Sequence, residues 1–137
     1  MTCSIHKLNE LSNYKYVVIL SRYQNQILLS RHKTRTTWET QGGHIEANET
    51  ELEAAKRELH EESGAIEYDI IPLFDYRAGD ENSNANGMVF FADIKRLGAL
   101  PISEMETVES FDKLPENLTY PEITPRLFEK AKEYFSN

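Results

Sequence analysis

The feature that most constrains this fold is a bounded helical segment near the middle of the 137-residue chain. Thr50 and Glu53 have the spacing of a capping box, which marks where a helix begins. Gly64 stands where a helix C-cap is expected. Between these ends, apolar residues recur at spacings of three and four and form one stripe: Leu52, Ala55 and Leu59. The pattern predicts a helix over Glu49–Ser63 that packs its stripe against other structure.

Strand-forming segments surround this helix. Tyr14–Tyr23 is rich in β-branched and aromatic residues, and Gln24-Asn25 predicts a hairpin turn into a second strand, Gln26–Arg31. Polar residues fill His32–Thr37, which predicts a loop. After the helix, we expect strands at Ala65–Leu73, Phe74–Arg77, Gly87–Ile94 and near Val108–Phe111, with a polar loop over Gly79–Gly87.

A second helix is predicted at the end of the chain. Thr124 and Pro125 are a favoured pair of residues for a helix start. Its expected buried stripe comprises Leu127, Phe128, Ala131, Tyr134 and Phe135. The order of strands, helix, strands and helix predicts a single α/β domain over residues 1–137, in which a mixed sheet packs between helices.

Composition excludes several classes of protein. Fifteen basic and 23 acidic residues give a net charge of −8, which argues against non-specific binding of nucleic acid. The longest purely apolar run is Val17–Leu20, too short to span a membrane. Cys3 is the single cysteine, and Met1–Tyr14 lacks an apolar signal region. We therefore expect a cytoplasmic protein with no membrane and no nucleic-acid partner, as a monomer or a homodimer.

Acidic residues are concentrated on the central helix. Glu58, Glu61 and Glu62 fall within an arc of about 100° on a helix. Their mutual repulsion costs a few tenths of a kcal/mol for each pair, and the helix dipole disfavours anions at this end. A solvated acidic face is one explanation. The other is a site for a hard divalent cation, because Mg²⁺ prefers carboxylate and carbonyl oxygens.

A longer pattern surrounds the three acids. From Gly43 the chain reads G-HIEAN-E-TELEAAK-RELHEE-S-G-A, which matches G-x5-E-x7-R-E-U-x-E-E-x-G-U, where U is aliphatic. This segment, residues 43–65, resembles the signature box of the Nudix hydrolase family. Seven strictly typed positions match: Gly43, Glu49, Arg57, Glu58, Glu61, Glu62 and Gly64. Leu59 fills the first aliphatic position, and Ala65 is a small residue at the last.

The resemblance implies a Nudix fold, with a mixed sheet between helices (α/β/α) and a loop–helix–loop box. It also implies hydrolysis of a nucleoside diphosphate linked to another group, with Mg²⁺ or Mn²⁺ as cofactor. Four residues take metal-site roles by position: Glu58 and Glu62 as direct ligands, Glu61 through water, and Gly42 through its carbonyl. Arg57 resembles the arginine that orients the catalytic glutamate.

Residues outside the box complete the resemblance. Some MutT-like members carry the proton acceptor on a loop before a late strand, where this chain has Glu104 and Glu106; the count from Phe111 favours Glu104. Arg31 and His32 resemble phosphate-contacting basic residues. Trp38 is a candidate for stacking on a base, with core or loop packing as the alternative.

The substrate is less constrained. WETQGGHIE, residues 38–46, resembles a stretch of MutT-like members in which Thr40 and Gln41 replace phenylalanine and proline. The downstream proline and tyrosine markers of ADP-ribose and diadenosine polyphosphate enzymes are missing. We expect cleavage of a nucleoside triphosphate, including oxidised ones such as 8-oxo-dGTP, to a monophosphate and pyrophosphate. The alternatives are a hydrolase of ADP-ribose, a dinucleotide or a nucleotide sugar, and a non-catalytic ligand-binding module.

Overall fold

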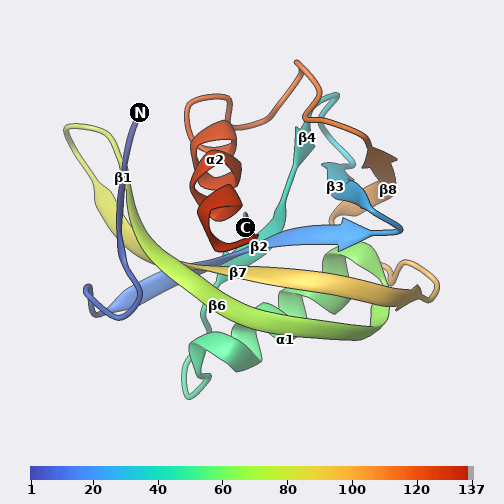
Figure 1. Cartoon of the computed structure of the whole chain (residues 1–137), viewed down its shortest axis with the longest axis horizontal. Coiled ribbons are helices and arrows are strands. Elements are labelled where there is room, and N and C mark those ends of the chain that lie inside the picture. The colour runs from blue at the N-terminus through green and yellow to red at the C-terminus, as the bar shows by residue number, and fades with distance from the viewer. Residues whose placement is uncertain (136–137) are drawn as a thin grey trace.

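The computed structural model describes residues 1–135, which form a mixed sheet between two helices (Figure 1). The elements are β1 Thr2–Lys7, β2 Tyr14–Tyr23, β3 Gln26–His32, β4 Trp38–Glu39, β5 Gln41–His44, α1 Glu51–Ser63, β6 Ala65–Gly79, β7 Asn84–Leu97, β8 Met105–Phe111 and α2 Thr124–Phe135. The strand order is β1-β6-β7-β2-β3-β4, while β5 pairs with β2 and β8 pairs with β3. Only the β2–β7 pair among these is parallel, so the predicted mixed α/β sheet is confirmed.

The observed strands match the predicted ones where the sequence is rich in β-branched and aromatic residues, and they differ from the prediction elsewhere. β2 has the predicted bounds, and Gln24 and Asn25 both take the positive φ that a tight hairpin needs. The two strands predicted between residues 65 and 77 are instead one strand, β6, with an irregular register between Pro72 and Phe74. Part of the predicted Gly79–Gly87 loop belongs to β7, which begins at Asn84. The sequence did not predict β1, β4 or β5.

Both predicted caps of α1 are present, although the helix begins at Glu51 and not at the predicted Glu49. Thr50 and Glu53 exchange the two hydrogen bonds of a capping box, and Gly64 has a left-handed φ of 80°. The buried face comprises Ala54, Ala55, Leu59 and Ser63. Leu52, predicted to share that face, is 40% exposed. Apart from Leu59, the helix therefore approaches the sheet through small residues.

The sheet has a separate core on each side. In β2, Val17 and Ile19 pack with α1, whereas Leu20 packs with α2, as the alternation of a strand requires. Leu127 and Ala131 are buried beneath α2, but Tyr134 and Phe135 are half-exposed, so the predicted stripe of α2 is wrong at its end. Neither described helix has the length and apolar character that crossing a membrane demands.

Candidate active site

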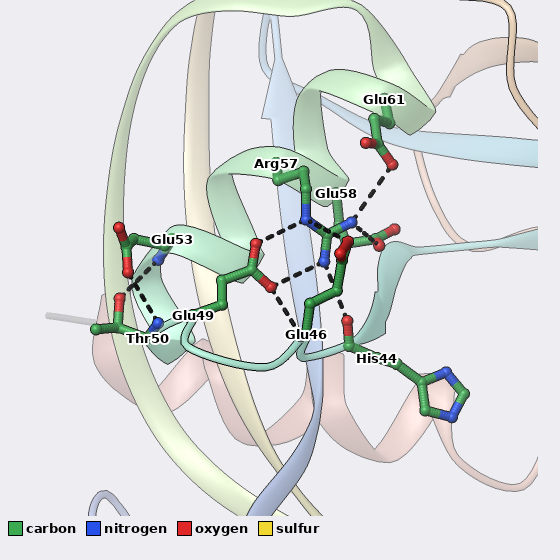
Figure 2. Close-up of polar contacts among 8 residues, drawn as sticks. All are labelled: His44, Glu46, Glu49, Thr50, Glu53, Arg57, Glu58 and Glu61. Carbon is green, nitrogen blue, oxygen red and sulfur yellow. Dashed lines mark hydrogen bonds and ion pairs between the residues drawn. The ribbon is translucent and has the colours of Figure 1, made fainter.

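The acids near the end of α1 meet the glycine-containing strand β5 and the end of β3. In α1, Arg57 is the centre of a polar cluster, drawn in Figure 2. Its Nε lies 2.7 Å from Glu49 Oε2, and its Nη2 donates to Glu49 Oε1 at 3.0 Å and to the His44 carbonyl at 3.1 Å. Arg57 thereby joins the helix to the loop that precedes it.

The same guanidinium also reaches the acids further along α1. Its Nη1 donates to Glu58 Oε1 at 2.6 Å and lies 3.5 Å from Glu61 Oε2. The hydrogen bonds with Arg57 lower the pKa of Glu49 to about 2, and those with Glu49 and Glu58 raise the pKa of Arg57. The predicted i, i+4 pair of Arg57 and Glu61 is present, but it is longer than the bonds to Glu49 and Glu58.

Glu58 is held against β5. A Cβ added to Gly43 would lie 2.8 Å from the Glu58 carboxyl carbon, so a larger residue there would push this carboxylate from its present position. Burial raises the pKa of Glu58, while the hydrogen bond from Arg57 opposes that shift. The Gly43 position of the box is therefore explained by a close approach between strand and carboxylate.

Glu62 lies on the side of α1 nearest Gly42. The Gly42 N–H donates to Glu62 Oε1 at 2.8 Å. Burial raises the pKa of Glu62 to about 8, despite this hydrogen bond, and the negative charges of Glu58, Glu39 and Glu104 act in the same direction. Glu62 is thus a desolvated carboxyl group surrounded by other acids, an environment that a cation would relieve.

The donor set suits a hard divalent cation in type. Glu58, Glu61 and Glu62 offer carboxylate oxygens on one helix. Burial is the main cause of the raised pKa of Glu62, and the negative charges of neighbouring acids add to it. Glu61 is the most accessible, with 48% of its side chain exposed, against 12% for Glu58. Among residues 1–135, no three acidic, histidine or cysteine side chains are already gathered around one metal position.

The loop before β8 brings Glu104 to the end of β3. Glu104 Oε2 lies 3.5 Å from His32 Nε2, and its backbone carbonyl accepts from Lys33 N–H at 2.9 Å. His32 is oriented by Thr34, whose backbone N–H donates to Nδ1 at 3.1 Å. Glu106, the other candidate, is exposed on β8. The structure thus gives Glu104, which also influences Glu62, a place beside the box.

Arg31 and Trp38 lie together on neighbouring strands. The Arg31 guanidinium carbon is 5.8 Å from the Trp38 ring centroid, and the two residues are partners in the β3–β4 ladder. Phe111 meets the indole edge-on, with ring centroids 5.2 Å apart. Trp38 therefore has packing partners of its own, while it stays partly exposed.

Sequence reasoning missed Glu39 as a member of this region. Glu39 is 9% exposed and accepts from Arg35 Nη1 at 3.0 Å and from Thr119 Oγ1 at 3.1 Å. Its charge contributes to the raised pKa of Glu62. The sequence offered only a weak signal, namely that Glu39 lies close to the box. An acid in a polar stretch is expected to be exposed to solvent, so its burial was not predicted.

Comparisons with known proteins find relatives of this chain in both sequence and fold. The family model described as NUDIX domain matches residues 13–131. YtkD of Bacillus subtilis strain 168, named as an 8-oxo-dGTP diphosphatase, is 33% identical over 106 residues, which cover 77% of this chain and 66% of YtkD. An RNA pyrophosphohydrolase of Francisella tularensis subsp. mediasiatica is 36% identical over 53 residues, covering 39% of this chain and 34% of that protein.

A solved structure extends the similarity to the whole fold. The pyrophosphohydrolase BsRppH of Bacillus subtilis superimposes with a TM-score of 0.83 and 26% identity, covering 96% of this chain and 90% of that one. The alignments with the two sequence relatives, in contrast, span less than two thirds of the length of either relative.

Proposed function

Because the chain belongs to the Nudix hydrolase family, we propose that it is a divalent-cation-dependent pyrophosphohydrolase of nucleoside triphosphates. It cleaves between the α- and β-phosphates and releases a monophosphate and pyrophosphate. The observation that carries this proposal is Glu62: a desolvated carboxyl group with a pKa of about 8, on the same helix as Glu58 and Glu61. A binding module has no need of such an arrangement of acids.

Members of this family generally use divalent cations such as Mg²⁺. Here Glu58, Glu62 and the Gly42 carbonyl would hold Mg²⁺, for which Mn²⁺ can substitute, and Glu61 would contribute through water. When bound, the cation would neutralise phosphate charge and lower the pKa of a water molecule. Side chains of the protein would orient the ligands, accept the proton from water and contact the substrate.

Arg57 is proposed as a positioning residue. Its bonds to Glu49 and to the His44 carbonyl fix the guanidinium against the loop, and its bond to Glu58 then fixes that carboxylate beside Gly43. Phosphoryl transfer depends on alignment and on charge stabilisation more than on covalent chemistry. Holding Glu58 in one orientation is the contribution expected of such an arginine.

Glu104 is proposed as the proton acceptor for the attacking water. Its side chain is 83% exposed, so it can reach a bound substrate, and its backbone is anchored to Lys33. The neighbouring His32 and Arg31 are proposed to contact phosphate oxygens. Trp38 is proposed to contact the base through the part of its ring that Phe111 does not cover.

The similarity to YtkD supports a triphosphate substrate, with oxidised guanine nucleotides as its leading members. A second candidate is the 5′-triphosphate end of RNA, as the name of the Francisella relative suggests. In a chain of net charge −8, three cations lie on or just after the end of β3: Arg31, Lys33, whose backbone is bonded to Glu104, and Arg35, which is paired with Glu39. These cations could meet phosphates beyond the first nucleotide.

Hydrolysis of ADP-ribose, a dinucleotide or a nucleotide sugar remains the alternative from the sequence. A panel of substrates separates the candidates: nucleoside triphosphates including 8-oxo-dGTP, ADP-ribose, a dinucleotide, and a 5′-triphosphorylated oligoribonucleotide. Products are resolved by anion-exchange chromatography. We expect mononucleotide triphosphates to give pyrophosphate. A tenfold higher kcat/KM for ADP-ribose or a dinucleotide than for every triphosphate would overturn the proposal, and a tenfold preference for the oligonucleotide would select the second candidate.

A further inference from the structure

A line of buried polar side chains runs through the core beside α1. Ser21 on β2 is 2% exposed, and Gln41 on β5 and Ser30 on β3 are both 0% exposed. Ser21 Oγ donates to Gln41 Oε1 at 2.6 Å, and Gln41 Nε2 donates to Ser30 Oγ at 2.9 Å. Ser30 Oγ in turn donates to the Glu62 carbonyl at 2.8 Å. The three side chains therefore link three strands to the last turn of α1.

Burying such a line of polar groups lowers the stability of the fold unless every member forms hydrogen bonds. Burying a hydroxyl or amide group without a hydrogen bond costs about 1–3 kcal/mol in proteins. Here each donation leads to the next group, and Gln41 Nε2 also reaches the Leu28 carbonyl at 3.3 Å. An amide at position 41 can accept from Ser21 and donate to Ser30 at the same time. An apolar side chain of similar size could do neither.

The end point of the line is a carbonyl that the helix itself leaves unpaired. Glu62 lies in the last turn of α1, where backbone carbonyls have no partner further along the helix. Ser30 supplies that partner. On the other side of the same residue, the Glu62 side chain accepts from the N–H of Gly42, the residue next to Gln41 in β5. Glu62 is thus held at two points, and both depend on where Gln41 sits.

We propose that Gln41, acting through Ser30, is a positioning residue for Glu62. This inference rests on the proposed function, because Glu62 matters as a candidate cation ligand there. Gln41 is too deeply buried to touch a substrate or a cation. Its role is to fix the distance between β5 and the end of α1, so that the Gly42 N–H holds one carboxylate oxygen of Glu62.

Nuclear magnetic resonance of the metal-free protein, without substrate, tests whether Gln41 and Ser30 position Glu62. The amide proton of Gly42 reports the hydrogen bond to Glu62, and Glu62→Gln gives the shift expected when the carboxylate is lost. We expect Ser30→Ala and Gln41→Met to move the Gly42 amide proton in the same direction as Glu62→Gln. Ser30→Ala is the cleaner variant, because position 30 is remote from Gly42 in sequence. Ser21→Ala, which leaves the bonds from Gln41 to Ser30 and from Ser30 to the Glu62 carbonyl intact, is the matched control and should leave that proton near its wild-type position.

Kinetics provides the second readout. Ser30→Ala and Gln41→Met should lower kcat about 10-fold, in the range found for residues that orient metal ligands. The KM for the nucleotide should stay nearly constant, because the substrate contacts are elsewhere. Ser21→Ala should retain most of its kcat.

Two failures are distinguishable. If the Ser30→Ala and Gln41→Met proteins are folded and less stable, yet keep the wild-type Gly42 shift and kcat, the line of side chains is only structural and the inference is wrong. If the wild-type protein hydrolyses nothing on the panel, the proposed function is wrong, while the Gly42 shift still decides whether Gln41 and Ser30 position Glu62.

Discussion

The two faces of the sheet bury different chemistry. Beneath α2, the core is built from aliphatic and aromatic side chains such as Phe74 and Leu127, and the Phe74 and Tyr134 rings stack with centroids 5.9 Å apart. Beneath α1, the apolar cluster adjoins buried Ser30 and Gln41. The α1 face also carries the carboxylates of the candidate site, because Glu58, Glu61 and Glu62 belong to α1, the helix that lies across the sheet from α2 (Figure 1).

The difference separates stability from function. Apolar side chains gain stability from burial alone, in proportion to the area removed from water. Desolvated carboxylates such as Glu62 oppose folding of the metal-free chain, because burial disfavours their charged form. We conclude that the α2 face mainly stabilises the domain. On the α1 face, the buried carboxylates of the candidate site lower the folding stability of the metal-free chain.

The largest effect on the α1 face is expected from the proton acceptor. Glu104→Gln should reduce kcat by ~100- to 10,000-fold, the usual range for loss of a general base, with little change in KM. Glu106→Gln is the matched control, since that acid is exposed on β8. Steady-state kinetics on the preferred triphosphate compares the two. If Glu106→Gln is the impaired variant, the assignment of Glu104 is wrong, and if neither is, Glu61 becomes the candidate.

The box carboxylates come next. Glu61→Gln and Glu62→Gln should each lower kcat by at least ~100-fold, about 2.7 kcal/mol in barrier height, because each change removes negative charge offered to the cation. Glu51→Gln makes the same chemical change in the first turn of α1 and should keep nearly full activity. Losses below threefold in a folded Glu61 or Glu62 variant would remove that residue from the site.

On the opposite face, the effect should fall on stability. Leu127 is 1% exposed beneath α2, and Leu127→Ala should lower the free energy of unfolding by about 2.5 kcal/mol through the cavity it leaves. Chemical denaturation measures this loss. At a temperature where the variant is fully folded, kcat should equal that of the wild type. A large fall in kcat there would show that the two faces are not separable.

The pKa of Glu62 predicts an effect of pH on stability. A carboxyl group whose pKa is raised to about 8 on folding stabilises the protonated folded state, and this stabilisation is lost as the pH rises from about 4.5 through 8. Glu62→Gln removes the titrating group. In chelator, the variant should therefore become increasingly more stable than the wild type between pH 5 and pH 8. A constant difference measured by thermal unfolding would contradict the raised pKa.

The sequence predicted well those features of the α1 face that depend on residues close together in the chain. The capping box and the left-handed Gly64 depend on neighbours within a few residues, so spacing alone located both ends of α1. The box pattern likewise identified Arg57 and the acids that it contacts. The family model and the fold confirm that identification of the family.

The parts that depend on distant partners could not be predicted in the same way. β1 is a strand because it pairs with the end of β6 more than sixty residues later. Gln41 looks exposed by composition, and only the approach of Ser21 and Ser30 makes its burial tolerable. The burial of Glu39 depends on Thr119, which lies far away in sequence. These contacts carry no local signal that spacing or periodicity could reveal.

The central claim is that the acids on the α1 face serve a divalent cation in pyrophosphate hydrolysis. Pyrophosphate release from the preferred triphosphate, measured against free Mg²⁺ concentration from excess chelator upward, tests it most directly. We predict no detectable hydrolysis in chelator, full recovery when Mg²⁺ or Mn²⁺ is restored, and a rate that rises toward alkaline pH. Full activity in excess chelator would contradict the claim.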